Sequence, residues 1–139
     1  MRVDLGTAAL VLGLAACSVV ATSSVQEGAL RYVALGDSYT IGTSVSAPES
    51  WPSQLVARVP ALQLAANLGV DGYTSRDLID AELSALGGLA PEFVTVMIGV
   101  NDVVQGVPEA AYRANLQEIL DVILALLPAN RGLCGATPD

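Results

Sequence analysis

Short apolar runs alternate with longer amphipathic segments, and this alternation constrains the fold more than any other feature of the sequence. The runs at residues 32–35, 62–66 and 93–98 have the length and the β-branched, alternating or continuous apolar character of strands. Their ends recur about every 30 residues, the size of one strand–helix–strand unit. Successive units of this kind predict an α/β fold with a parallel sheet and right-handed crossovers.

The amphipathic segments predict helices at residues 51–59, 74–86 and 108–127. Proline stands in the first turn of the first and third helices, where it is favoured. Thr74 and Asp77 form a candidate capping box at the start of the second helix. Each helix has one apolar face, as expected for helices that pack on a sheet.

The polar residues that could act on a substrate lie in the turns that follow the strands. The first turn reads Gly-Asp-Ser and ends at Ser38, the second contains Gly69 and Gly72, and the third contains Asn101. Because parallel strands deliver their carboxyl ends to one edge of a sheet, where ligands bind, we expect the three turns to meet there. Residues 39–50, rich in Ser, Thr and Gly, are predicted to form a loop over this edge.

These groups fit the needs of an acyl-transfer site. Ser38 is a candidate nucleophile, and the backbone N–H groups of Ser38 and Gly72, with the side-chain amide of Asn101, could stabilise an oxyanion. A structural explanation is also open, because Asn101 could be a turn residue and Gly72 could serve the backbone geometry alone. The same structural explanation is open for other residues of the turns: Asp37, Asn67, Gly69 and Asp102.

Composition excludes several classes of function. The 139 residues allow one domain at most, and 53% of them are hydrophobic against 14% charged, so the chain forms a core. The net charge of −8 argues against a nucleic-acid partner. With no histidine and only Cys17 and Cys134 as thiols, the chain offers neither a disulfide framework nor a zinc site.

The motifs at the three strand ends resemble those of the SGNH (GDSL) hydrolase family. They are Gly36-Asp37-Ser38, then Gly72, then Gly99-x-Asn101-Asp102, in the order and spacing of that family, and the resemblance covers residues 31–128. It implies a flavodoxin-like three-layer α/β/α domain over residues 30–139 and a serine esterase mechanism without metal or cofactor. Carried over, Ser38 is the nucleophile, and Gly72 and Asn101 belong to the oxyanion hole together with the Ser38 N–H.

The sequence departs from the family pattern at its fourth motif, an Asp-x-x-His whose histidine acts as general base. There is no histidine in the chain. Residues 132–139 fall where the family has its fourth strand and are less apolar than that strand usually is. We therefore expect a domain truncated after the third helix or fourth strand; the alternative is a natural short protein without activity. Cys134 is expected to be an inert strand residue, or else to pair outside the chain.

The first residues have the pattern of an export signal. Residues 5–16 are uncharged and follow Arg2, which is too short a run to span a bilayer but fits the apolar core of a signal peptide. The run ends in Leu-Ala-Ala-Cys, which resembles a bacterial lipobox, so we expect residues 1–17 to be a signal peptide and Cys17 to carry the lipid. Residues 18–29 then form a tether to the domain. The alternative is a secretory signal cut near Ala21.

Two functional interpretations follow from the sequence. The first is an envelope-anchored serine hydrolase of small or medium esters, in contact with the membrane through its lipid. The second is a non-catalytic or decayed envelope lipoprotein that binds an acyl ligand. A nucleotide or flavin binder on the same fold is disfavoured, because residues 36–42 match neither a dinucleotide fingerprint nor a Walker loop.

Overall fold

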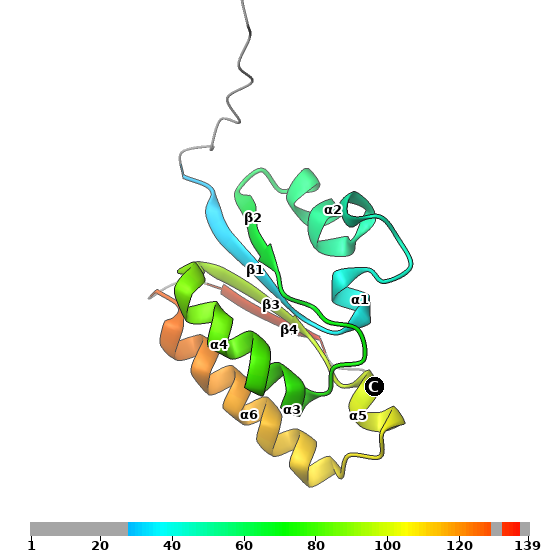
Figure 1. Cartoon of the computed structure of the whole chain (residues 1–139). Helices are drawn as coiled ribbons and strands as arrows, with labels where there is room; N and C mark the ends of the chain where they lie inside the picture. Colours follow the sequence, from blue (N-terminus) through cyan, green and yellow to red (C-terminus); the bar gives the residue numbers. More distant parts are fainter. Residues whose placement is uncertain (1–27, 129–131, 137–139) are drawn as a thin grey trace, which may run out of the picture.

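The computed structural model describes residues 28–128 and 132–136, which fold around one sheet (Figure 1). Its four strands pair in the order β2-β1-β3-β4, and every pair is parallel. The predicted parallel arrangement is therefore confirmed. The strands are β1 (Leu30–Gly36), β2 (Leu62–Asn67), β3 (Phe93–Met97) and β4 (Gly132–Ala136).

The main core lies between the sheet and one layer of helices. In the β1–β3 register, Val33 pairs with Val94 and Leu35 with Val96, so branched side chains of both central strands line the same face. The helical layer over this face supplies further buried residues, including Leu78, Leu86, Ile119 and Ile123. It consists of α3 (Ser75–Asp77), η2 (Leu78–Glu82), α4 (Leu83–Leu86), η3 (Gly87–Leu89) and α6 (Glu109–Leu126).

A second, smaller layer completes the α/β/α arrangement. Helix α2 (Trp51–Arg58) packs against β2 on the side of the sheet away from α4 and α6 (Figure 1). Its Pro52 is buried at the second helical position, where proline is favoured. The predicted three-layer fold is thus confirmed.

Two short helices were not predicted from the sequence. The expected loop at 39–50 begins with α1 (Ser38–Ile41) and contains the 3₁₀ turn η1 (Ala47–Glu49), and a further short helix, α5 (Val100–Val104), follows β3. The loop prediction was wrong at its start because Asp37 caps α1: its Oδ1 accepts the Tyr39 N–H at 3.0 Å. Such single-turn helices are too short to show a periodicity in the sequence.

The predicted helix at 74–86 is present but has a π-helical centre. The Thr74–Asp77 capping box is confirmed, with the Asp77 carboxylate accepting the Thr74 N–H at 2.9 Å. Segment η2 then follows, and the N–H of Leu83 bonds to the carbonyl of Leu78, five residues back. Segments of this kind are rare and often lie near functional sites.

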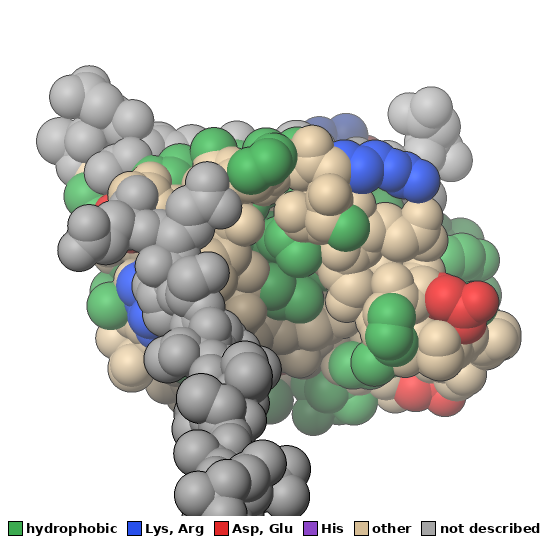
Figure 2. Space-filling model, turned by 90° about the horizontal axis from the view of Figure 1, so that it is seen from above, with side chains coloured by type: hydrophobic (Ala, Val, Ile, Leu, Met, Phe, Trp, Pro, Cys, Tyr) green, Lys and Arg blue, Asp and Glu red, His purple; other side chains and the backbone are tan. Residues whose placement is uncertain are grey.

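One face of the domain shows few charged side chains. Seen from above, uncharged and hydrophobic side chains make up most of the visible face, with isolated basic and acidic groups between them (Figure 2). Within residues 28–128 and 132–136, no helix is both long and apolar enough to cross a membrane. The predicted signal peptide at 1–17, the lipidation site Cys17 and residues 18–27 of the tether lie outside the described residues.

Candidate active site

Ser38 is the first residue of α1, directly after the turn that ends β1, and its side chain is partly exposed. Because it opens the helix, its N–H has no acceptor within that helix. The neighbouring Asp37 is buried, and its carboxylate caps the helix at Tyr39. Burial raises the pKa of Asp37, while the hydrogen bond from Tyr39 lowers it. This geometry agrees with the structural interpretation of Asp37 as a turn residue.

The second turn is tied directly to the first. The Asn67 side-chain amide donates to the carbonyl of Thr40 at 2.8 Å, and its oxygen accepts the Gly69 N–H at 3.2 Å. The Val70 N–H donates to the carbonyl of Gly36 at 3.1 Å. Asn67 therefore bridges the two turns and holds the backbone before Gly72 beside the Ser38 turn.

Gly72 combines an unusual backbone conformation with open space. Its φ is 80°, a region that favours glycine, and a Cβ at this position would meet no atom within 4 Å. Among the residues that the structure describes, none accepts a hydrogen bond from the Gly72 N–H. Its carbonyl accepts the side-chain amide of Gln105 at 3.2 Å. The glycine thus offers a backbone donor on a face that another molecule can approach.

Asn101 lies in α5 and points toward the Gly72 turn. Its Nδ2 donates to the carbonyl of Tyr73 at 2.8 Å. Because a side-chain amide has two N–H groups, this bond leaves one for a ligand. The contact also joins the turns that follow β2 and β3, although β1 lies between these two strands in the sheet.

A buried network holds α5 in place. Both oxygens of Asp102 accept from Ser75, one from its N–H at 2.8 Å and the other from its hydroxyl at 2.5 Å. Asn115 of α6 donates to the Ser75 hydroxyl at 2.9 Å. Since Asp102 and Ser75 are 2% and 0% exposed, these bonds replace water for both residues. Asp102 is a structural anchor for the helix that presents Asn101.

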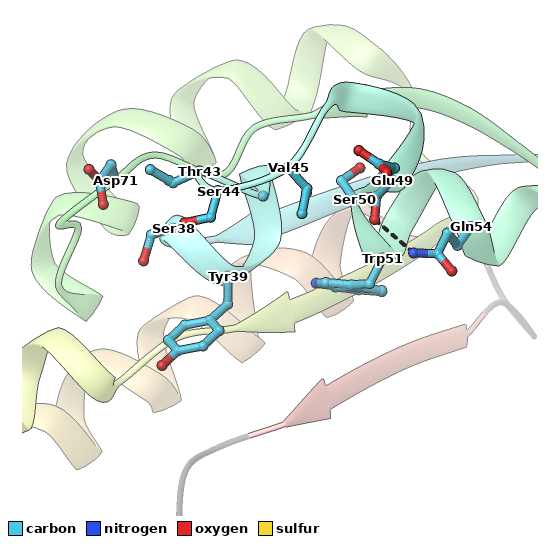
Figure 3. A pocket seen from close by; sticks show the side chains of 11 residues that line it. Ser38, Tyr39, Thr43, Ser44, Val45, Glu49, Ser50, Trp51, Gln54 and Asp71 are labelled. Carbon is cyan, nitrogen blue, oxygen red and sulfur yellow. Dashed lines mark hydrogen bonds between the residues drawn. The ribbon is translucent and has the colours of Figure 1, made fainter.

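A cavity of about 570 Å³ opens beside Ser38 (Figure 3). Tyr39 lines it on the α1 side and Trp51 on the α2 side, and several Ser and Thr side chains also line it. Its acidic lining residues are Glu49 and Asp71, and none of its described lining residues is Lys or Arg. Hydrogen bonds from the side chain and backbone of Ser46 lower the pKa of Glu49. Uncharged groups therefore make up most of the lining, and the two acidic residues give the cavity its negative charge.

Glu82 is a residue near the site that we did not predict from the sequence. It is 3% exposed, and its Oε2 accepts the N–H of Gly36, two residues before Ser38, at 2.9 Å. The sequence does contain a sign that Glu82 is buried, because it lies at helical spacing between Leu78 and Leu86 and is thus an acid within an apolar stripe. Within the described residues, no group of three or more His, Cys, Asp and Glu residues could hold a metal ion.

Comparisons with known proteins give one family and several related structures. The sequence profile of the GDSL-like Lipase/Acylhydrolase family matches residues 34–138. The SGNH-hydrolase family esterase AlinE4 is 24% identical with a TM-score of 0.67, over 77% of this chain and 58% of that chain. LAE5, an alpha/beta hydrolase enzyme from the metagenome of Lake Arreo, is 26% identical with a TM-score of 0.60, over 76% of this chain and 59% of that chain.

The psychrotrophic esterase EstA from Pseudoalteromonas sp. is 22% identical with a TM-score of 0.64, over 78% of this chain and 61% of that chain. No curated protein matches the chain. The chain spans between 54% and 59% of the length of the first structures that it resembles. These structures share its fold over most of the residues described here.

Proposed function

The chain belongs to the GDSL-like lipase/acylhydrolase family, and from that membership we propose that it carries the nucleophile and the oxyanion hole of a serine ester hydrolase. The observation that carries the proposal is the meeting of three turns at one sheet edge. There the Ser38 side chain lines a cavity, while the Gly72 N–H and one N–H of Asn101 have no acceptor among the described residues. Acyl transfer needs a serine hydroxyl and unused N–H donors of these kinds at one site.

In the proposed reaction, Ser38 Oγ attacks the carbonyl carbon of the ester, and the electron pair of the carbonyl moves to its oxygen. The N–H groups of Ser38 and Gly72 and the amide of Asn101 stabilise that oxyanion. Collapse of the intermediate breaks the bond to the alcohol, and water then releases the acid and restores Ser38. The proton of Ser38 passes to a base and on to the leaving alcohol.

The base is the missing part of this scheme. The 139 residues contain no histidine. Loss of a triad member lowers the rate by several orders of magnitude but leaves the contribution of the oxyanion hole. We therefore expect the 139-residue chain to acylate slowly. This same observation favours the second candidate function, a protein that binds an acyl ligand without turnover.

The charge of the cavity favours particular esters. Glu49 and Asp71 would repel a substrate that carries a phosphate or carboxylate near its ester bond. We propose uncharged small or medium esters as the substrate class, with no metal or cofactor. Lowering the salt concentration should increase the discrimination against anionic esters, because it weakens screening.

Covalent labelling with an uncharged phosphonate ester tests the proposal, because it requires a reactive serine and no turnover. Intact-mass analysis should show slow addition of one phosphonyl group to the wild-type chain and none to Ser38→Ala. Ser84→Ala is the matched control, because Ser84 is exposed on α4 and, among the described residues, its hydroxyl bonds only to the carbonyl of Ala81. Equal labelling of wild type and Ser38→Ala would refute the esterase proposal. Reversible binding without labelling in either would favour the acyl-binding function.

We further propose that the protein is exported and anchored by a lipid on Cys17. The support is the Leu-Ala-Ala-Cys pattern at the end of the uncharged segment at residues 5–16. Expression in a bacterium fed a labelled fatty acid should give a labelled, membrane-bound protein, and Cys17→Ser should remove the label. A mature protein that begins just after Ala21 would instead indicate secretion without an anchor.

A further inference from the structure

Glu82 is a buried acid that the proposed chemistry does not use. It is the last residue of η2, and it lies in the same buried stripe as Leu78 and Leu86. A carboxyl group in such a stripe is costly unless its oxygens are engaged. Only Oε2 is engaged among the described residues, while Oε1 is buried without a hydrogen-bond partner.

The engaged oxygen contacts the backbone at the base of the nucleophile turn. Gly36 has a φ of 149°, and a Cβ there would lie 2.2 Å from the carbonyl oxygen of Met97 and 2.4 Å from Thr40 Oγ1. Its carbonyl accepts the Val70 N–H, and its N–H donates to Glu82. The peptide groups that lead to Ser38 are thus held on one side by the second turn and on the other by Glu82.

We propose that Glu82 is a positioning residue for the nucleophile, acting through the Gly36 N–H. The inference rests on the proposed function of Ser38. It means that the helical layer on the main core helps to fix the position of the nucleophile turn. The π-helical bond between Leu83 and Leu78 lies at this same point of the helix. Loss of the acceptor would leave the Gly36 N–H buried without a partner and free the turn to shift.

The charge state of Glu82 makes this contact sensitive to pH. Burial raises the pKa of Glu82 to about 8, while the Gly36 N–H acts in the opposite direction. The charged group that faces it from the nucleophile turn is Asp37, whose negative charge also raises the pKa. Helix α6 faces the same core with apolar Ile119 and Ile123. The neutral form of Glu82 is therefore favoured at pH 7, and ionisation near pH 8 would place a buried charge beside Asp37.

Amide NMR of the full 139-residue chain tests the contact independently of catalysis. From pH 6 to 9.5, the Gly36 amide resonance should move with a midpoint near 8, and Glu82→Gln should abolish that step. Glu118→Gln is the matched control, since Glu118 is an exposed acid on α6 that pairs with Arg76 at 3.6 Å. This control should retain the step. A step that persists in Glu82→Gln would overturn the assignment.

The phosphonate labelling rate of Ser38 tests the consequence for the nucleophile. At pH 7 the rate in Glu82→Gln should stay within about threefold of wild type, because glutamine keeps the acceptor. In Glu82→Met it should fall at least tenfold per folded molecule. The difference between the pH profiles of wild type and Glu82→Gln should centre near pH 8. Equal rates in folded wild type and Glu82→Met would refute the positioning role.

Unreactive Ser38 in every variant would refute the esterase proposal, and with it the positioning of a nucleophile. The Gly36 titration would then still decide whether the Glu82 contact exists. The two failures are therefore distinguishable from the two measurements.

Discussion

The Asp102–Ser75 pair provides the sharpest test of how α5 is held against the Gly72 turn. Asp102→Ala removes two hydrogen bonds, of 2.8 and 2.5 Å, and leaves two buried donors of Ser75 without their acceptor. Hydrogen bonds to charged groups contribute about 1.5–3 kcal/mol each. Removing a buried carboxylate also removes its desolvation cost. We therefore expect a net loss of about 2–4 kcal/mol in the free energy of unfolding.

Ser75→Ala should lower the free energy of unfolding by less than Asp102→Ala, by about 1–2 kcal/mol, because the bond from the Ser75 backbone N–H to Asp102 remains. The double variant should lose less than the sum of the two single losses, with a coupling of at least about 0.5 kcal/mol. Urea unfolding measures these values if the slope m stays unchanged. The loss expected for Asp102→Ala is a substantial part of the free energy of unfolding of a domain of this size, which is about 5–15 kcal/mol.

Asp121→Ala is the matched control for the loss of an acid. Asp121 is exposed on α6, and within the described part of the chain its carboxylate accepts only the side-chain amide of Gln117. Its removal should change stability by no more than about 0.5 kcal/mol. If Asp102→Ala were as mild as this control, or if the two single losses simply added, the buried network would not be what fixes α5.

Two further perturbations follow from the site. The pKa of Glu82 is raised to about 8 in the folded state and is about 4.3 when the chain is unfolded. Between these two values the folded protein keeps the Glu82 proton and the unfolded chain loses it. The free energy of unfolding should therefore fall by up to about 5 kcal/mol as pH rises from 4.5 to 8. Thermal melts across this range should show the fall in wild type and a much flatter profile in Glu82→Gln; a flat wild-type profile would contradict the burial argument. Gly72→Ala should lower the free energy of unfolding by about 1–2 kcal/mol, because the φ of Gly72 is 80°. Gly88 is equally open but has no positive φ, so Gly88→Ala should be neutral or stabilising. Equal losses for the two variants in urea unfolding would show that the backbone conformation is not the cause.

The layers of the fold could be predicted because periodicity is a local property of the sequence. The apolar run at 93–98 and the alternation at 62–66 gave β3 and β2 nearly at their observed bounds. The capping box at Thr74 and Asp77 was readable because its two residues are three positions apart. The split of the second helix by η2 was not readable, since one shifted hydrogen bond leaves the apolar stripe unchanged.

The turns of the candidate site were predicted only as neighbours. Their common sheet edge follows from parallel strands, and the structure joins the second and third turns through Asn101 and Tyr73. The direction of each side chain was beyond the sequence. That Asp37 caps a helix and Asp102 anchors another became visible only with their partners in place.

The sequence by itself determined the order of strands and helices along the chain, the faces that are buried and the polar residues at the strand ends. Each of these depends on nearby residues and on the periodicity of the apolar side chains. The tertiary structure alone decided which of these groups meet. Gly36 and Glu82 are 46 positions apart, and Ser75 and Asp102 are 27 apart. Periodicity specifies that Glu82 points inward, but its partner depends on how the helix sits against the sheet. That placement is set by the packing of the whole core rather than by any local pattern.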